Sequence, residues 1–275
     1  MAVARYWVGG SGDWTDTAHW SATSGGAGGA SVPTSVDFAN FTNLSGSGTV
    51  TLSGDVSVAG LTFSSCPSTT ITGAYKITSI NTYFVGTSVV SFTGTSVTSG
   101  SFEMESGCTV SLGTGTFTVS SSWVGNASIS AMSSVVSIQA QTGSATMTTN
   151  NGNYNTVRVF GTVQLSCGTS EFNLLEHFSS STSKETVVTL VSDVSAKQYS
   201  FNKGGLASSL RSDSFLSQRT LNFPSGSTPG VSSFGNVNLY YINITETPTY
   251  VYNGGNLGGN TGFVFLNNSG AIALF

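Results

Sequence analysis

Charged residues are scarce in this chain. Asp, Glu, Lys and Arg make up 7% of its 275 residues, against roughly 25% in an ordinary soluble domain. The eight Lys and Arg residues form no stripe, and the formal net charge is −4, so the electrostatic attraction that dominates binding to a phosphate backbone is missing. We therefore expect no nucleic-acid partner.

Long apolar runs are missing as well. No stretch approaches the ~18 apolar residues of a membrane-spanning helix, and the opening Met-Ala-Val-Ala-Arg-Tyr-Trp lacks the apolar core of a signal peptide. The apolar end Ala271–Phe275 is similar to the last strand of an outer-membrane barrel, but without a signal peptide we interpret that likeness as accidental. No membrane partner is expected.

Metal-binding and nucleophile motifs are also absent. Cys66, Cys108 and Cys167 are odd in number and show no C-x-x-C spacing, so they indicate small inward-facing side chains and neither a zinc site nor a disulfide framework. His19 and His177 are far apart in the sequence, and His19 is predicted to be a hydrogen-bonded packing residue. There is no phosphate-binding loop, nucleophile elbow or calcium-binding nonapeptide repeat. We expect no metal and no cofactor.

Short strands are the dominant pattern in what remains. Segments of alternating apolar and hydroxyl-bearing residues, typical of strands with one buried face, are separated by turn residues at intervals of roughly 6 to 10 positions. The segment closest to a helical pattern is Glu171–Phe178. The clearest strand segments are Thr49–Leu52, Val56–Phe63, Val89–Thr93, Cys108–Leu112, Thr116–Ser120, Val135–Ile138, Thr156–Phe160 and Val187–Val191.

These strands predict an all-β fold, a single elongated β-solenoid resembling a parallel β-helix. The strands are many, short and not arranged in long hairpin pairs, which disfavours the alternative of a tandem β-sandwich or jelly roll. Coils of about 20 residues would give on the order of ten coils. Because open sheet edges pair with other chains unless covered, we expect an N-terminal cap over residues 1–45, a solenoid body over 46–234, and a C-terminal cap and tail over 235–275.

A dense aromatic block opens the chain. Three of its four tryptophans, Trp7, Trp14 and Trp20, lie within fourteen positions among Gly and Asp turns, and we predict that they form a packed cap. The small-residue loop Gly25–Ala30 and the VPTSxD turn Ser31–Asp37 follow. Together these motifs resemble the opening of bacteriophage virion proteins and bacterial surface proteins built on β-solenoids, in which this segment would close the first coil.

The end of the chain resembles the same phage group independently. Leu210–Ser214 and Gln218–Leu221 are similar to its "LRSD…RTL" rung, and Gly258–Phe265 to its terminal glycine-asparagine turn, with Phe263 where that pattern usually has Trp. We expect Phe263 and Phe265 to belong to the C-terminal cap. The resemblance implies a virion structural protein, made in the host cytoplasm and exposed on the particle surface as a capsid decoration or a tail-associated component.

One acidic pair suggests catalysis. Glu103 and Glu105 would share one face of a strand at roughly 7 Å, within the range that glycosidases use. No aromatic residues are evidently interleaved around the pair, so we interpret both as solvated and predict no enzymatic activity. The alternative is a receptor- or glycan-binding tail fibre or tailspike, with exposed Tyr and Trp as sugar platforms and a possible depolymerase activity against a host glycan.

Assembly is expected from the composition. Burying uncharged Ser, Thr and Val faces costs little ion desolvation, which favours a homo-oligomer, predicted here as a trimer bound to another virion protein. The tail Ala271–Phe275, with Ile272, Leu274 and Phe275 as its large apolar residues, has no evident strand partner in its own turn and is a candidate assembly arm. The alternative is an edge strand tucked onto its own last coil.

Overall fold

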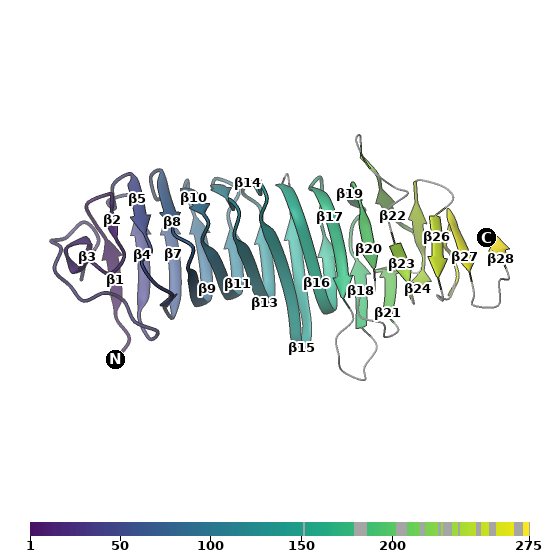
Figure 1. Ribbon diagram of the computed structural model, residues 1–275, viewed down its shortest axis with the longest axis horizontal. Helices are drawn as coiled ribbons and strands as arrows, with labels where there is room; N and C mark the ends of the chain where they lie inside the picture. The colour runs from purple at the N-terminus through teal and green to yellow at the C-terminus, as the bar shows by residue number, and fades with distance from the viewer. Residues whose placement is uncertain are drawn as a thin grey trace. The chain divides into compact units, whose positions relative to one another are not determined.

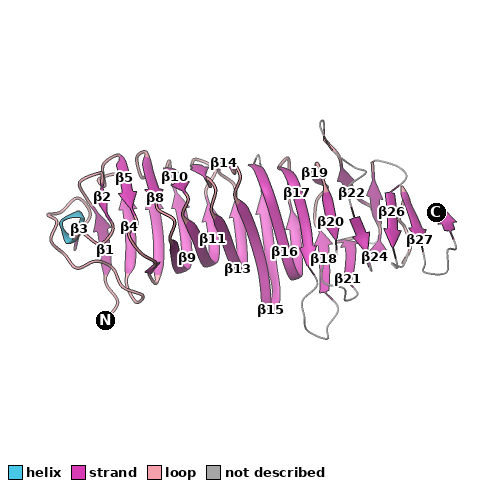
Figure 2. Cartoon of the chain, viewed as in Figure 1, coloured by secondary structure: helices cyan, strands magenta, loops and turns pink. Residues whose placement is uncertain are grey.

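The structure is a computed structural model of the chain. It describes residues 1–150, 152–178, 186–201, 208–214, 218–224, 227, 233–235, 237–245, 249–252, 257–266 and 272–274. Strands make up 60% of the chain, which is a β-solenoid of about eight turns (Figures 1 and 2). The prediction of an all-β solenoid is confirmed, and the one helical turn in the described ranges is the 3-10 turn η1, Thr17–His19.

The chain divides into two compact units, Met1–Val135 (unit 1) and Val136–Phe275 (unit 2). The cap and body boundaries expected at residues 45 and 234 stay predictions. The strands of unit 1 are β1 Ala4–Trp7, β2 Gly12–Asp13, β3 Trp20–Ser21, β4 Phe38–Thr42, β5 Gly48–Thr51, β6 Val56–Ser57, β7 Gly60–Ser64, β8 Thr69–Thr72, β9 Lys76–Val85, β10 Val89–Thr93, β11 Ser96–Met104, β12 Thr109–Ser111, β13 Thr116–Gly125 and β14 Ser128–Ser130.

Unit 2 is likewise built of strands. They are β15 Val135–Thr149, which begins at the last residue of unit 1, β16 Gly152–Ser166, β17 Glu171–Phe178, β18 Thr186–Leu190, β19 Val194–Ala196, β20 Tyr199–Phe201, β21 Ser208–Ser212, β22 Arg219–Asn222, β23 Ser233–Gly235, β24 Val237–Tyr240, β25 Ile242–Ile244, β26 Thr249–Tyr252, β27 Phe263–Leu266 and β28 Ile272–Leu274. The segment Glu171–Phe178, closest to a helix in its pattern, is therefore a strand.

Successive coils of unit 1 stack in parallel register and present three outward faces. The first face consists of β1, β4, β7 and the C-terminal halves of β9, β11 and β13. The second consists of β2, β5, β8, β10, β12 and β14, and the third of β6 and the N-terminal halves of β9, β11 and β13. Phe38 pairs with Gly60 and Gly60 pairs with Asn81, so these consecutive coils are nearly equal in length.

An aromatic ladder fills the interior behind the first face. The Phe41 and Phe63 rings stack with centroids 4.9 Å apart, and Phe63 and Phe84 repeat that distance. Trp7 continues the ladder at 5.8 Å from Phe41. Since 4.7–4.9 Å is the distance between neighbouring strands, each inward ring lies directly above its equivalent in the next coil.

Corners require glycine where the coils approach each other. Gly113 has a φ of +60°, and a Cβ there would lie 1.9 Å from the Phe92 carbonyl oxygen of the preceding coil. A side chain larger than hydrogen is therefore excluded both by the backbone conformation and by contact. This is the physical reason for glycine at this corner.

The solenoid has about eight turns, where on the order of ten were expected. Coil length is less regular outside the stretch from β4 to β13. The first coil runs from Ala4 to its partner Phe38, and in unit 2 Ser200 pairs with Ser233. Both spans are much longer than the step from Phe38 to Gly60. Inside unit 2 the Phe201 and Phe234 rings stack at 5.3 Å, and the buried Tyr199 hydroxyl lies 2.7 and 2.9 Å from the carbonyl oxygens of Val194 and Asn222.

Antiparallel strands lie at both chain ends. In unit 1, β3 pairs antiparallel with β1, with Trp7 opposite Trp20. The other neighbour of β1 is β4, which pairs with it in parallel. In unit 2, β28 pairs antiparallel with β27. Antiparallel pairing ends a parallel stack because the added strand returns along the edge that a further coil would use.

Candidate functional site

The tryptophan block is packed inside the first coil. Trp7, Trp14 and Trp20 are each at most 1% exposed. The Trp14 and Trp20 rings meet edge to face at 4.9 Å, and Trp20 Nε1 donates to the Trp14 carbonyl oxygen at 2.7 Å. None of the three rings is displayed to a ligand, so they do not form a sugar platform. Their function as a cap of the first coil stays a prediction.

His19 is part of the same packing. Its ring stacks on Trp7 at 4.9 Å, and Nδ1 lies 2.9 Å from the Val8 carbonyl oxygen. Gly12 lies against the ring, since a Cβ there would be 2.2 Å from His19 Nε2. The prediction of a hydrogen-bonded packing histidine is confirmed.

The VPTSxD turn contains a buried carboxylate. Asp37 is 5% exposed and accepts hydrogen bonds from the Thr34 hydroxyl at 2.6 Å, the Thr34 N–H at 2.9 Å and the Val3 N–H at 3.0 Å. The Thr34 hydroxyl, the Thr34 N–H and the Val3 N–H hold the pKa of Asp37 below its usual value. The motif therefore ties the start of the chain to the turn before β4.

Asp13, the residue before Trp14, likewise accepts hydrogen bonds that join two segments of the chain. Its Oδ1 accepts from the Thr15 hydroxyl at 2.6 Å and the Thr15 N–H at 2.8 Å, and the Ser53 hydroxyl of the next coil donates to it at 2.9 Å. The Thr15 and Ser53 donors lower the pKa of Asp13. In the body of unit 1, Asp55 accepts from the Lys76 N–H at 2.9 Å, again one coil further along the chain.

Glu103 and Glu105 differ in their surroundings. Glu105 Oε2 accepts from the Gly86 N–H of the preceding coil at 2.7 Å, so this carboxylate is held at a corner. Glu103 is exposed on β11 and lies in register with Tyr83 of β9 on one side and Val124 of β13 on the other. The expectation that no aromatic residue lies beside the pair is therefore wrong. Tyr83 was missed because it is a whole coil away in sequence, and the coil repeat is the signal that could have found it.

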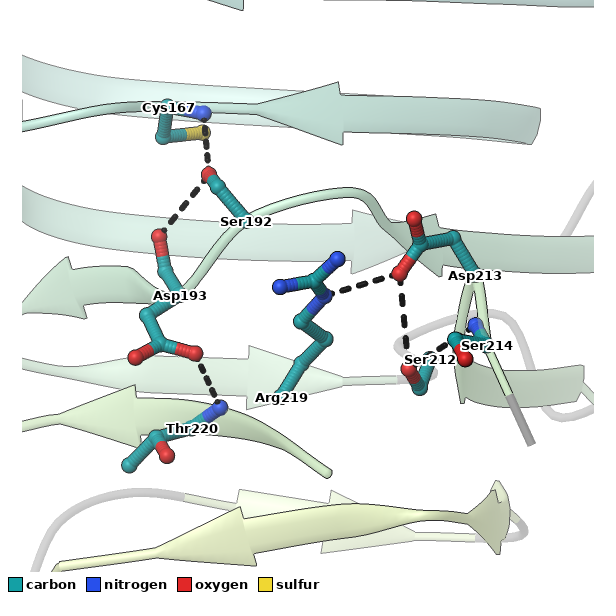
Figure 3. A network of polar contacts seen from close by, with 8 residues as sticks. All are labelled: Cys167, Ser192, Asp193, Ser212, Asp213, Ser214, Arg219 and Thr220. Atoms are coloured by element: carbon teal, nitrogen blue, oxygen red, sulfur yellow. Dashed lines mark hydrogen bonds and ion pairs between the residues drawn. The ribbon is translucent and has the colours of Figure 1, made fainter. Parts of the chain in front are cut away.

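The LRSD…RTL motif forms an ion pair in unit 2 (Figure 3). Arg219 Nε donates to Asp213 Oδ1 at 2.7 Å, and the Ser212 hydroxyl lies 3.5 Å from the same oxygen. The Ser214 N–H donates to the Ser212 hydroxyl at 3.1 Å. Arg219 lowers the pKa of Asp213, and Asp213 in turn raises the pKa of Arg219. Both side chains are near 30% exposed, which makes the net contribution of this pair small.

A second chain of contacts runs beside it in Figure 3. Asp193 Oδ1 accepts from the Thr220 N–H at 2.8 Å, while the Ser192 hydroxyl donates to the Asp193 carbonyl oxygen at 3.1 Å. Ser192 Oγ also accepts from the Cys167 N–H at 2.8 Å. These contacts join segments 25 and 27 residues apart, so this network is another connection between coils.

The side chain of Asn260 holds the terminal glycine-asparagine turn against the preceding coil. Asn260 is 8% exposed, with Oδ1 accepting from the Ile242 N–H and Nδ2 donating to the Leu239 carbonyl oxygen, both at 2.8 Å. Phe263 is buried against Phe234, with ring centroids 5.8 Å apart. Phe265 lies on β27, and its side chain is outside the description.

In the structure, the tail forms a strand that pairs with its own chain, as in the tucked-strand alternative. Ile272 and Leu274 lie on β28, in register with Leu266 and Val264 of β27, so the expectation that this segment has no strand partner is wrong. Phe275 lies outside the described residues. Exchange of this strand with another copy stays a prediction.

The remaining polar groups of interest are buried. Cys66, Cys108 and Cys167 are free and buried, as predicted, and burial raises the pKa of Cys66 to about 11 and of Cys167 to about 12. His177 is fully buried on β17, where burial lowers its pKa to about 4. The described residues contain no group of three or more metal-ligating side chains.

Comparison with known proteins adds no relative. No family model, curated protein or solved structure matches the chain. Within the described ranges, no helix has the length and apolar character needed to cross a membrane. The resemblance to phage virion proteins thus depends on the motifs whose contacts are given above.

Proposed function

We propose that the protein is a non-catalytic structural component of a bacteriophage virion. It is exposed on the particle surface, as a capsid decoration or a tail-associated protein, and its partners are other virion proteins. The proposal takes its virion assignment from the opening and closing motifs. Its structural character depends on how the chain uses its carboxylates.

Most described carboxylates are occupied by the fold itself. Backbone N–H groups donate to the side chains of Asp13, Asp16, Asp37, Asp55, Glu105 and Asp193. Asp37, Asp55, Glu105 and Asp193 accept from a residue 19 to 34 positions away, which joins one coil to another. A glycosidase needs two carboxylates free to exchange protons or attack the sugar, and Glu105 is not free. This observation carries the proposal of a structural function.

Immunoelectron microscopy tests the location. Gold-labelled antibody against the purified chain should decorate intact phage particles from the source culture at regular positions on the capsid or tail. Pre-immune serum is the control. Label confined to debris or to host cells, with bare particles, would refute a virion component.

A reducing-end assay tests the absence of catalysis. Host capsular and envelope polysaccharides incubated with the protein should release no new reducing ends. Release that persists in Glu103→Gln but disappears in Glu105→Gln, or the reverse, would identify an acting carboxylate and overturn the proposal. A protein that binds sugar without cleaving it leaves this assay unchanged.

A further inference from the structure

The outward aromatic side chains of the unit 1 strands gather on one of the three faces. The second face presents Thr and Ser pairs, such as Thr49 and Thr51 on β5 and Thr70 and Thr72 on β8, in register from coil to coil. The third face presents Thr78 and its equivalents. The first face alone presents Tyr and Phe, on strands that lie side by side in Figure 1.

The register builds one continuous column of side chains along this face. Tyr6 pairs with Asn40, Asn40 with Thr62, Thr62 with Tyr83, and Tyr83 with Glu103. All five point outward, because their neighbours Trp7, Phe41, Phe63, Phe84 and Met104 are buried. Neighbouring members are one strand spacing apart, roughly 4.8 Å, so Tyr83 and Glu103 occupy adjacent positions on this face.

Phe38 adds an exposed ring to the next column of the same face. It is 47% exposed, which is high for a large apolar side chain, and it lies in register with Gly60, which pairs with Asn81. A Cβ at Gly60 would lie 2.7 Å from Phe38 Cδ1, so the ring covers this glycine. The Asn40 amide nitrogen donates to the Arg5 and Phe38 carbonyl oxygens at 3.2 and 3.3 Å, which holds this amide in place on the first face.

Glu103 and Glu171 differ from the other carboxylates that the structure describes. Nearly all the other described carboxylates accept a hydrogen bond from the protein, whereas Glu103, like Glu171, has no hydrogen bond or ion pair within the described residues. Tyr83 is also without a described hydrogen bond or ring contact. On the first face, the Glu103 carboxylate and the Tyr83 ring are therefore both available to a ligand.

We propose that this face, centred on Tyr83 and Glu103, binds a neutral or amine-bearing glycan. Aromatic rings supply flat apolar surfaces for the C–H face of a sugar ring, while a carboxylate and amides pair with hydroxyl and amine groups. Glu103 repels an acidic polysaccharide, which sets the class of ligand. A polysaccharide suits this face because the column extends over five consecutive coils, so that one sugar chain can contact Tyr6, Tyr83 and Glu103 together.

Binding to immobilised polysaccharides tests the inference. The probes are a chitosan oligosaccharide, which carries free amines, an N-acetylated chitooligosaccharide and a neutral O-polysaccharide, with an acidic capsular polysaccharide as the fourth. At least one of the first three should bind with a Kd below about 1 mM, and Tyr83→Ala and Glu103→Gln should each weaken binding about tenfold. Tyr83→Phe, which keeps the ring, should bind within about threefold of the parent.

Two matched controls are not part of this face. Tyr75 is 42% exposed in the turn before β9, and Glu171 is an exposed and unpaired carboxylate of unit 2. Tyr75→Ala and Glu171→Gln should bind as the parent does. Equal weakening in the controls, no binding to any neutral or amine-bearing probe, or variants that change oligomer mass and not sugar binding would each overturn the inference. Gold labelling of particles is independent of these outcomes, so the two proposals fail separately.

Discussion

Acid should destabilise unit 2 through His177. The ring is fully buried on β17, its centroid 6.0 Å from that of Phe201, and its Nε2 lies 3.4 Å from the Thr186 hydroxyl. Burial lowers the pKa of His177 from 6.5 to about 4, because an imidazolium loses its hydration in the coil interior. The unfolded chain therefore binds the proton first as the pH falls.

The sign and size of the effect follow from that difference. With the folded pKa below the unfolded one, stability is complete above about pH 6.5 and decreases as the pH falls towards 4. A gap of roughly 2.5 pKa units, at 1.36 kcal/mol per unit, amounts to about 3 kcal/mol of lost unfolding free energy by about pH 4. That is a large part of the stability of an ordinary domain.

His177→Gln isolates this group. The variant cannot titrate in this range, so its unfolding free energy should change little between about pH 7 and pH 4.5, where the parent loses about 2 kcal/mol. Unfolding in urea is measured by hydrogen exchange at the β17 amides, which reports on unit 2 directly. Parallel pH curves for the two proteins would refute the reasoning, whatever the variant costs at neutral pH.

Three further changes probe the caps. Trp14→Ala should cost about 3–5 kcal/mol because the ring is buried, and a stable variant that instead loses sugar or partner binding would contradict the cap. Asp37→Asn should cost about 1–3 kcal/mol at neutral pH through its weakened contacts with Thr34, measured by thermal unfolding, and the difference should disappear in acid. Light scattering of the intact protein should give about three times the 28.2 kDa chain mass if it is a trimer. A folded monomer after deletion of 271–275 supports an exchanged strand, whereas a globally destabilised one supports the tucked strand.

Strand positions were predictable because alternation is local. Val89–Thr93 was expected as a strand and is β10 with the same bounds. Glu171–Phe178 resembled a helix because two buried polar residues interrupt its alternation. Glu176 accepts from Arg158 Nε at 2.8 Å across the sheet, and His177 faces the interior. The Glu176 contact is with a neighbouring coil, so the sequence of the segment itself does not show it.

Coil register could not be predicted, because it is set by contacts far apart in sequence. The step from Asn153 to its partner Glu171 is short, whereas the step from Ser200 to Ser233 is nearly twice as long. A single fixed coil length therefore predicts the wrong residue pairs between neighbouring coils in unit 2. From β4 to β13 in unit 1 the coil length varies little, and the neighbours Tyr83 and Glu103 on the first face follow from it. The sequence did not show the proposed glycan-binding face because the register between coils was unknown.

The two units should respond to acid in sequence, unit 2 before unit 1. Asp13 and Asp37 have pKa values below 3.8, so the stability that they give unit 1 is present above about that pH and is lost only as the pH falls through the lowered values. The pH range over which His177 lowers stability, from 6.5 down to about 4, lies above the range for Asp13 and Asp37.

All four tryptophans lie in unit 1, so their emission should remain native near about pH 4.5 while the β17 amides already exchange. Because each coil of a solenoid is stabilised mainly by its neighbours, opening at β17 need not reach the N-terminal cap. Tryptophan emission that changes at a higher pH than β17 exchange would contradict this order and assign the acid response to the cap carboxylates.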